Sequence, residues 1–68
     1  MDKEELMESV LFKHVKILTT DGETYIGKVK VYETPYDNDS DEGSVCLMTD
    51  DGEGICLVAS EIEDIEIV

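Results

Sequence analysis

The fold is decided by the stretch Val15-Lys-Ile-Leu-Thr-Thr-Asp-Gly-Glu-Thr-Tyr-Ile-Gly-Lys-Val-Lys-Val-Tyr32. Two runs rich in β-branched and aromatic residues flank an Asp-Gly pair at positions 21 and 22, which is typical of a tight hairpin turn. Gly27 interrupts the second run, and a glycine inside a strand usually marks a bulge or a sharp bend. The stretch therefore predicts a hairpin whose kinked second strand starts to curl the sheet. Strand alternation places Val29 and Val31 together on its apolar face.

The other elements follow from hydrophobic periodicity and from turn residues. Apolar residues at helical spacing behind Asp2 predict a helix over about residues 3–11, with Asp2 as its cap. Pro35 and the acidic residues after it predict a loop at about 34–43. The remaining expected elements are strands at about 14–20, 23–33, 44–49 and 54–59, one helical turn at 60–63 and a last strand at 64–68.

The strands at 44–49 and 54–59 are apolar on both faces, so both faces should be covered or one should meet a partner. If the turn between them is a three-residue loop with Gly52 in the left-handed region, Cys46 and Cys56 face each other across the hairpin. The last strand alternates isoleucine with acids. Such a strand at a sheet edge invites pairing with another subunit unless its charges prevent it.

Together these elements predict a mainly β fold: a short N-terminal helix plus a five-stranded, strongly bent antiparallel barrel. A chain of 68 residues has room for one small domain, which covers residues 1–68. No apolar run approaches the roughly 20 residues of a membrane span, and the acidic start of the chain lacks the apolar stretch of a signal peptide. We therefore expect a soluble, cytoplasmic protein with no membrane contact.

The charge of the chain is strongly negative and unevenly spread. Residues 1–30 hold six acids and five lysines, a net of −1, whereas residues 31–68 hold twelve acids and no Lys or Arg, a net of −12. Such a surface repels phosphate backbones at long range, which disfavours RNA as a partner. Two interpretations remain open: a solvated coat that keeps the protein soluble, or an acidic face at residues 37–53 that docks a basic protein.

The sequence offers few groups for catalysis or metal binding. Cys46 and Cys56 lie in apolar strand contexts, and free Cys is often buried, so we expect core packing in preference to a redox pair or half of a zinc site. His14 has no nucleophile pattern beside it, which favours a structural or solvent role. Residues 37–43 imitate half of a calcium loop, but Glu42 stands where that loop needs glycine. We expect no enzyme, no metal and no cofactor.

A helix followed by five short strands, with a kinked second strand and a helical turn before the last, resembles the Sm-like fold over nearly the whole chain. The first Sm motif is matched by residues 15–18, the Asp-Gly pair at 21 and 22, and residues 25–29. The tail of the second motif is matched by Ile62 and Ile65. A different small barrel of the SH3-like type is the alternative fold.

The resemblance implies a ring of six or seven subunits, in which the fourth strand of one subunit pairs with the fifth strand of the next. It also implies binding of uridine-rich or adenine-rich RNA. On this basis the RNA contacts would be Glu33, Tyr36, Asp37 and Asn38. Glu33 stands where the family usually has Asp, Asp37 stands where it has Asn, and the Arg-Gly pair of the second motif is replaced by Val58-Ala59.

The sequence therefore predicts a non-enzymatic Sm-like interaction or assembly module that self-associates through its edge strands. Its acidic half would face a basic partner. The alternative is an RNA-binding Sm-like protein acting as an oligomeric ring. Three lysines in and beside the first hairpin, together with the tyrosines, support that alternative: Lys16, Lys28 and Lys30.

Overall fold

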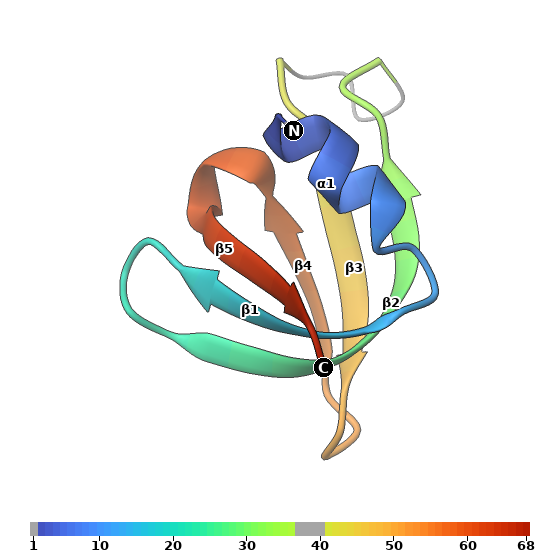
Figure 1. Cartoon of the computed structure of the whole chain (residues 1–68), viewed down its shortest axis with the longest axis vertical. Coiled ribbons are helices and arrows are strands. Elements are labelled where there is room, and N and C mark those ends of the chain that lie inside the picture. The colour runs from blue at the N-terminus through green and yellow to red at the C-terminus, as the bar shows by residue number, and fades with distance from the viewer. Residues whose placement is uncertain (1, 37–40) are drawn as a thin grey trace.

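The structure is a computed structural model that describes residues 2–36 and 41–68. They form one antiparallel five-stranded sheet with a short helix across one end (Figure 1). The elements are α1 (Lys3–Ser9), β1 (His14–Thr19), β2 (Thr24–Glu33), β3 (Ser44–Thr49), β4 (Gly54–Val58), the 3₁₀ turn η1 (Ala59–Glu61) and β5 (Ile62–Ile67). The strand order is β4-β3-β2-β1-β5. A mainly β fold with an N-terminal helix is confirmed, and β4 and β5 are the two edges of the sheet.

The two tight hairpins are built from the same five-residue sequence, Thr-x-Asp-Gly-Glu, at positions 19–23 and 49–53. In each, the Thr N–H donates to the Glu carbonyl at 2.8 Å, and the Gly N–H donates to the Thr carbonyl. Both glycines have φ +91°, in the left-handed region that a three-residue hairpin loop requires. The expected loop at Gly52 is confirmed, and Cys46 does lie opposite Cys56.

The bend in β2 differs from the prediction. The register with β3 shifts between Val29 and Val31, so the irregularity lies at Lys30 and not at Gly27. As a result Val31 turns to the outer face, where it is 45% exposed, while Val29 is fully buried. The prediction that these two valines share one apolar face is therefore wrong. Gly27 serves another purpose, because a Cβ there would lie 2.1 Å from the main-chain oxygen of Met48.

The core lies on the inner face of the bent sheet and beneath α1. Its eleven members are mostly aliphatic: Met7, Val10, Val15, Ile17, Val29, Val45, Leu47, Leu57, Ala59, Ile62 and Ile65. The Asp2 side chain accepts a hydrogen bond from the Glu5 N–H at 2.9 Å, which confirms the predicted cap. The helix ends at Ser9, two residues before the expected end, and Phe12 in the following turn has φ +66°.

The turn before the last strand also lies slightly earlier than predicted. The expected helical turn at 60–63 is a 3₁₀ turn at Ala59–Glu61, and β5 begins at Ile62. Glu42 fixes this turn, because its two carboxylate oxygens accept from the Ser60 N–H at 2.6 Å and from the Ser60 hydroxyl at 3.0 Å. Among the described residues, no helix is long and apolar enough to cross a membrane.

Candidate functional site

The edge strand β4 presents an uncharged backbone edge. Residues 54–58 read Gly-Ile-Cys-Leu-Val and include no charged side chain and no proline. Hydrogen-bonded and non-hydrogen-bonded pairs alternate along an antiparallel ladder. Counting from the bonded pair of Thr49 and Glu53, the main-chain groups of Gly54 and Cys56 point away from β3. An uncharged, unprotected edge of this kind is a template for pairing with another strand.

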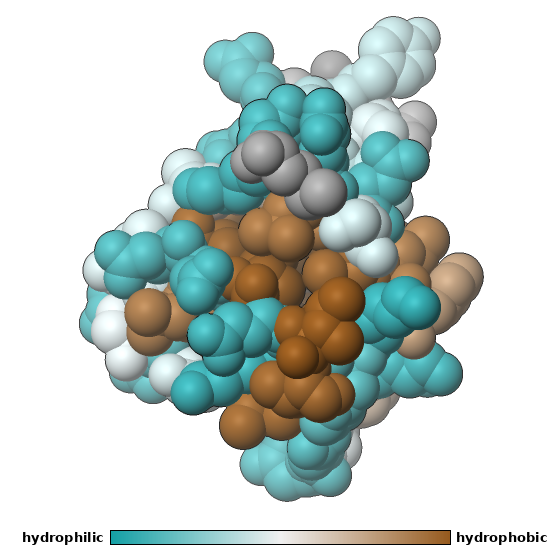
Figure 2. Space-filling view, viewed as in Figure 1, coloured by the Kyte–Doolittle hydropathy of each residue, from teal (hydrophilic) through white to brown (hydrophobic). Residues whose placement is uncertain are grey.

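The opposite edge, β5, is apolar and strongly acidic at once. Ile67 and Val68 are 64% and 58% exposed, and Figure 2 shows apolar surface reaching the region of the C-terminus. The Val68 N–H donates to the His14 carbonyl at 3.0 Å, so by the same alternation the main-chain groups of Ile65 and Ile67 point to the free side. The acids of this strand are exposed: Glu63, Asp64 and Glu66.

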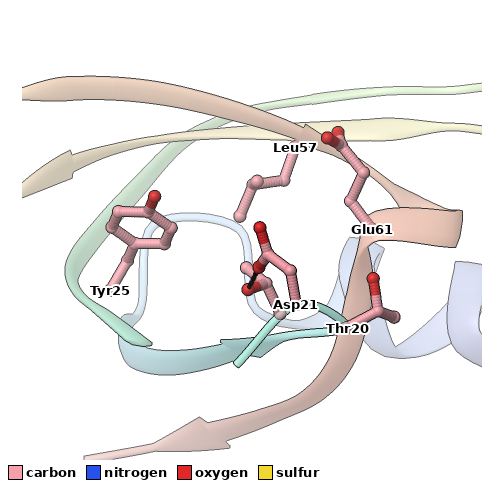
Figure 3. A pocket seen from close by; sticks show the side chains of 6 residues that line it. Thr20, Asp21, Tyr25, Leu57 and Glu61 are labelled. Atoms are coloured by element: carbon pink, nitrogen blue, oxygen red, sulfur yellow. Dashed lines mark hydrogen bonds between the residues drawn. The ribbon is translucent and has the colours of Figure 1, made fainter. Parts of the chain in front are cut away.

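A hollow lies between the first hairpin and the β4–η1 segment. Its volume is about 160 Å³, and the turn after β1, Tyr25 of β2, Leu57 of β4 and Glu61 of η1 line it (Figure 3). The Thr20 N–H donates to the Glu61 carbonyl at 3.0 Å and ties the first hairpin to η1 at this point. Tyr25 also lines a second, more open groove with Ile55 of β4. Leu57, a core residue, and the half-buried Ile55 thus line two hollows along the β4 edge.

The two cysteines lie outside the core. They form a disulfide between β3 and β4, with the Cα atoms 4.0 Å apart. Cys56 is exposed and Cys46 is half-buried. The expectation of free cysteines packed in the core is wrong, because alternation turns Val45, Leu47 and Leu57 inward and leaves both cysteines on the outer face. Two strands that are apolar on both faces do not show from sequence which face is buried.

The predicted RNA-contacting residues fall at the loop end of the sheet. Glu33 closes β2 opposite Ser44, and Tyr36 is 92% exposed. Asp37 and Asn38 lie outside the described residues, as do two other positions of the acidic loop. The structure therefore places two of the four predicted residues near one end of the molecule and does not describe the other two.

The N-terminal helix is tied to this same loop end by polar contacts that the sequence did not reveal. One Glu4 oxygen accepts from the Tyr32 hydroxyl at 2.8 Å, and the other accepts from the Gly43 N–H at 3.0 Å. Burial and the hydrogen bond to Glu4 raise the pKa of Tyr32 to about 12. The Lys3 ammonium donates to the Ala59 carbonyl at 3.0 Å. These contacts join α1 to β2, to the residue before β3 and to η1.

His14 joins the start of β1 to the turn between β3 and β4. Its Nε2 lies 2.9 Å from one carboxylate oxygen of Asp50, and its Nδ1 lies 3.4 Å from the Val68 carbonyl. The hydrogen bond to Asp50, followed by the one to Val68, raises the pKa of His14 above its ordinary value. The prediction of a structural role fits this contact. The pairing itself could not be predicted, because 36 positions separate the two residues.

Comparisons with protein-family models, with curated proteins and with solved structures yield no match for this chain.

Proposed function

We propose that this protein is a non-enzymatic assembly module in which β4 of one copy pairs with β5 of the next. In this proposal the bent sheet is an Sm-like barrel that is open between β4 and β5. The observation that supports it most is the difference between the two edges. β4 is neutral and apolar, whereas β5 combines exposed apolar residues with three acids.

The charges decide which edges can meet. Two β5 strands side by side would bring the acids of both copies together, and like charges across neighbouring strands are destabilising. A β4 strand adds no charge to the acids of β5. Pairing β4 with β5 also gives Ile67 an apolar neighbour and uses the outward main-chain groups of both strands. We therefore favour a head-to-tail contact over a contact between two identical edges.

An open row of subunits joined head to tail leaves an unpaired β4 at one end and an unpaired β5 at the other. Such contacts generate a ring if the rotation between subunits closes and a filament if it does not. A ring removes all free edges, and the resemblance to Sm-like proteins implies six or seven subunits. A β4–β4 contact would instead stop at a dimer and leave both β5 strands exposed.

The test compares two lysine variants that differ only in where the lysine stands. Ile67→Lys places it at the free side of β5, whereas the matched control Val31→Lys places it on the outer face of the interior strand β2. Both variants change the net charge from −13 to −12, because each adds one lysine and removes no acid. 

A lower net negative charge by itself favours association. We expect Ile67→Lys to shift the protein toward the monomer in sedimentation velocity, since lysine at a strand edge opposes edge pairing. Val31→Lys should keep the assembly of the wild type. Equal masses for the two variants and the wild type would refute pairing through β5.

RNA binding as an oligomeric ring is the alternative that the resemblance implies. Its support is a pair of exposed lysines, Lys16 and Lys28, on the outer face of the first hairpin. We rank it second because phosphate contacts depend on Lys and Arg, and the described loop end carries Glu4, Glu33 and Glu42. Binding of short uridine-rich RNA at low salt by the assembled form would promote this alternative.

A further inference from the structure

We propose that the Cys46–Cys56 disulfide is a reversible thiol–disulfide exchange site. Its reactants would be small thiols whose reactive form carries no net negative charge. Exchange would begin at Cys56. The proposal does not depend on self-association, because both cysteine side chains lie on the outer face of the sheet.

The position of the two cysteines favours exchange in the folded protein. Cys56 is exposed on an edge strand, so a thiolate can approach its sulfur without opening the core. Cys46 is half-buried on the interior strand β3, beside Val31 of β2. Exchange requires access to the sulfur under attack. The structure therefore distinguishes the two sulfurs, and Cys56 is the more accessible one.

The exchange proceeds in two balanced steps. An external thiolate bonds to the sulfur of Cys56, the bond between the two cysteines breaks, and Cys46 leaves as a thiolate. Cys46 then either attacks Cys56 again and expels the external thiolate, or remains free. In the second case another external thiolate attacks the mixed disulfide. The second external thiolate bonds to the sulfur of the first, the two leave together as a small disulfide, and Cys56 is released as a thiolate. Two external thiols are then oxidised and one protein disulfide is reduced.

The charge of the chain sets the preference among thiols. The protein carries a net charge of −13, and the turn that joins β3 to β4 contributes Asp50, Asp51 and Glu53. An anionic reactant is repelled by this field, whereas one that is neutral overall is not. The thiolate of cysteamine has no net charge because of its ammonium group, and the thiolate of mercaptoacetate carries two negative charges.

The test measures exchange of the folded, oxidised full-length protein with cysteamine and with mercaptoacetate, followed by acid quenching and peptide mass mapping. The same two thiols react in parallel with hydroxyethyl disulfide, an uncharged control that gives their intrinsic reactivities. We expect the mixed disulfide on Cys56. Relative to the control, the preference for cysteamine should rise about tenfold or more at low salt and shrink at high salt, because ions screen the field.

Three results would overturn the proposal. One is exchange that occurs only after the protein is unfolded in urea. Another is a mixed disulfide found mainly on Cys46. The third is a preference between the two thiols that equals that of the uncharged control at every salt concentration. Single variants give an independent check: the lone thiol of Cys46→Ser should react with a chromogenic disulfide faster than the lone thiol of Cys56→Ser.

Discussion

At the scale of single residues, Gly27 is the position where the sheet tolerates no side chain. A Cβ there would meet the Met48 oxygen at 2.1 Å and the Thr49 Cα at 2.6 Å, and both are main-chain atoms that cannot rotate away. Gly27→Ala should therefore lower the free energy of unfolding by at least about 2 kcal/mol, as overpacking does in well-packed proteins. Chemical denaturation measures this change.

Gly54→Ala is the matched control, because nothing lies within 4 Å of the Cβ that it would add. Its unfolding free energy should stay within about 0.5 kcal/mol of the wild type, as is usual for surface substitutions. A Gly27→Ala protein as stable as Gly54→Ala would show that β2 and β3 do not approach as closely as described.

His14 provides a pH-dependent contact that can be followed without ambiguity, because it is the only histidine in the chain. Its hydrogen bond to Asp50 raises its pKa above 6.5. A raised pKa means that folding favours the protonated form. The added stability is therefore fully present below pH 6.5 and is lost as the pH rises through the pKa of the folded state.

We expect Asp50→Asn to lower the pKa of His14, measured by NMR titration of the imidazole protons. Asp51→Asn is the control, since it removes an equal charge from the same turn but not the contact with His14. If both variants lowered the pKa equally, the general field of the acids and not the Asp50 contact would be responsible.

At the scale of elements, the β3–β4 hairpin is held by the cross-strand disulfide as well as by its ladder. The two cysteines are 10 positions apart, and closing a loop of that length restricts the unfolded chain. Replacing both cysteines by serine should lower the unfolding free energy by about 2–3 kcal/mol on the chain-entropy account. Denaturation of the oxidised wild type and of the double variant tests this value, and equal stabilities would contradict the cross-link.

The elements also show what local sequence can reveal. The Asp-Gly turns, the Asp2 cap and the succession of helix and strands along the chain follow from local patterns, and all were predictable. The irregularity at Lys30 was not, because it depends on how β2 pairs with β3, which lies beyond a loop. The same holds for the inner and outer faces of β3 and β4, since both faces are apolar in sequence.

At the scale of the whole molecule, the sequence predicted one mainly β domain but not the contacts that hold its loop end together. Glu4 looked like one of many surface acids, yet it accepts from both Tyr32 and Gly43. The sequence separations are 28 and 39 positions, so no local pattern could indicate them. Of the four predicted RNA contacts, only Glu33 and Tyr36 lie among the described residues.

The central claim, assembly through unlike edges, is tested most directly by the solution mass of the wild type. Light scattering at low and high salt should give several times the mass of one 7.6 kDa chain. The assembled fraction should be greater at high salt, because salt screens the repulsion between chains of net charge −13. A monomer at both salt concentrations would contradict the claim, and a dimer at both would replace β4–β5 pairing with a contact between identical edges.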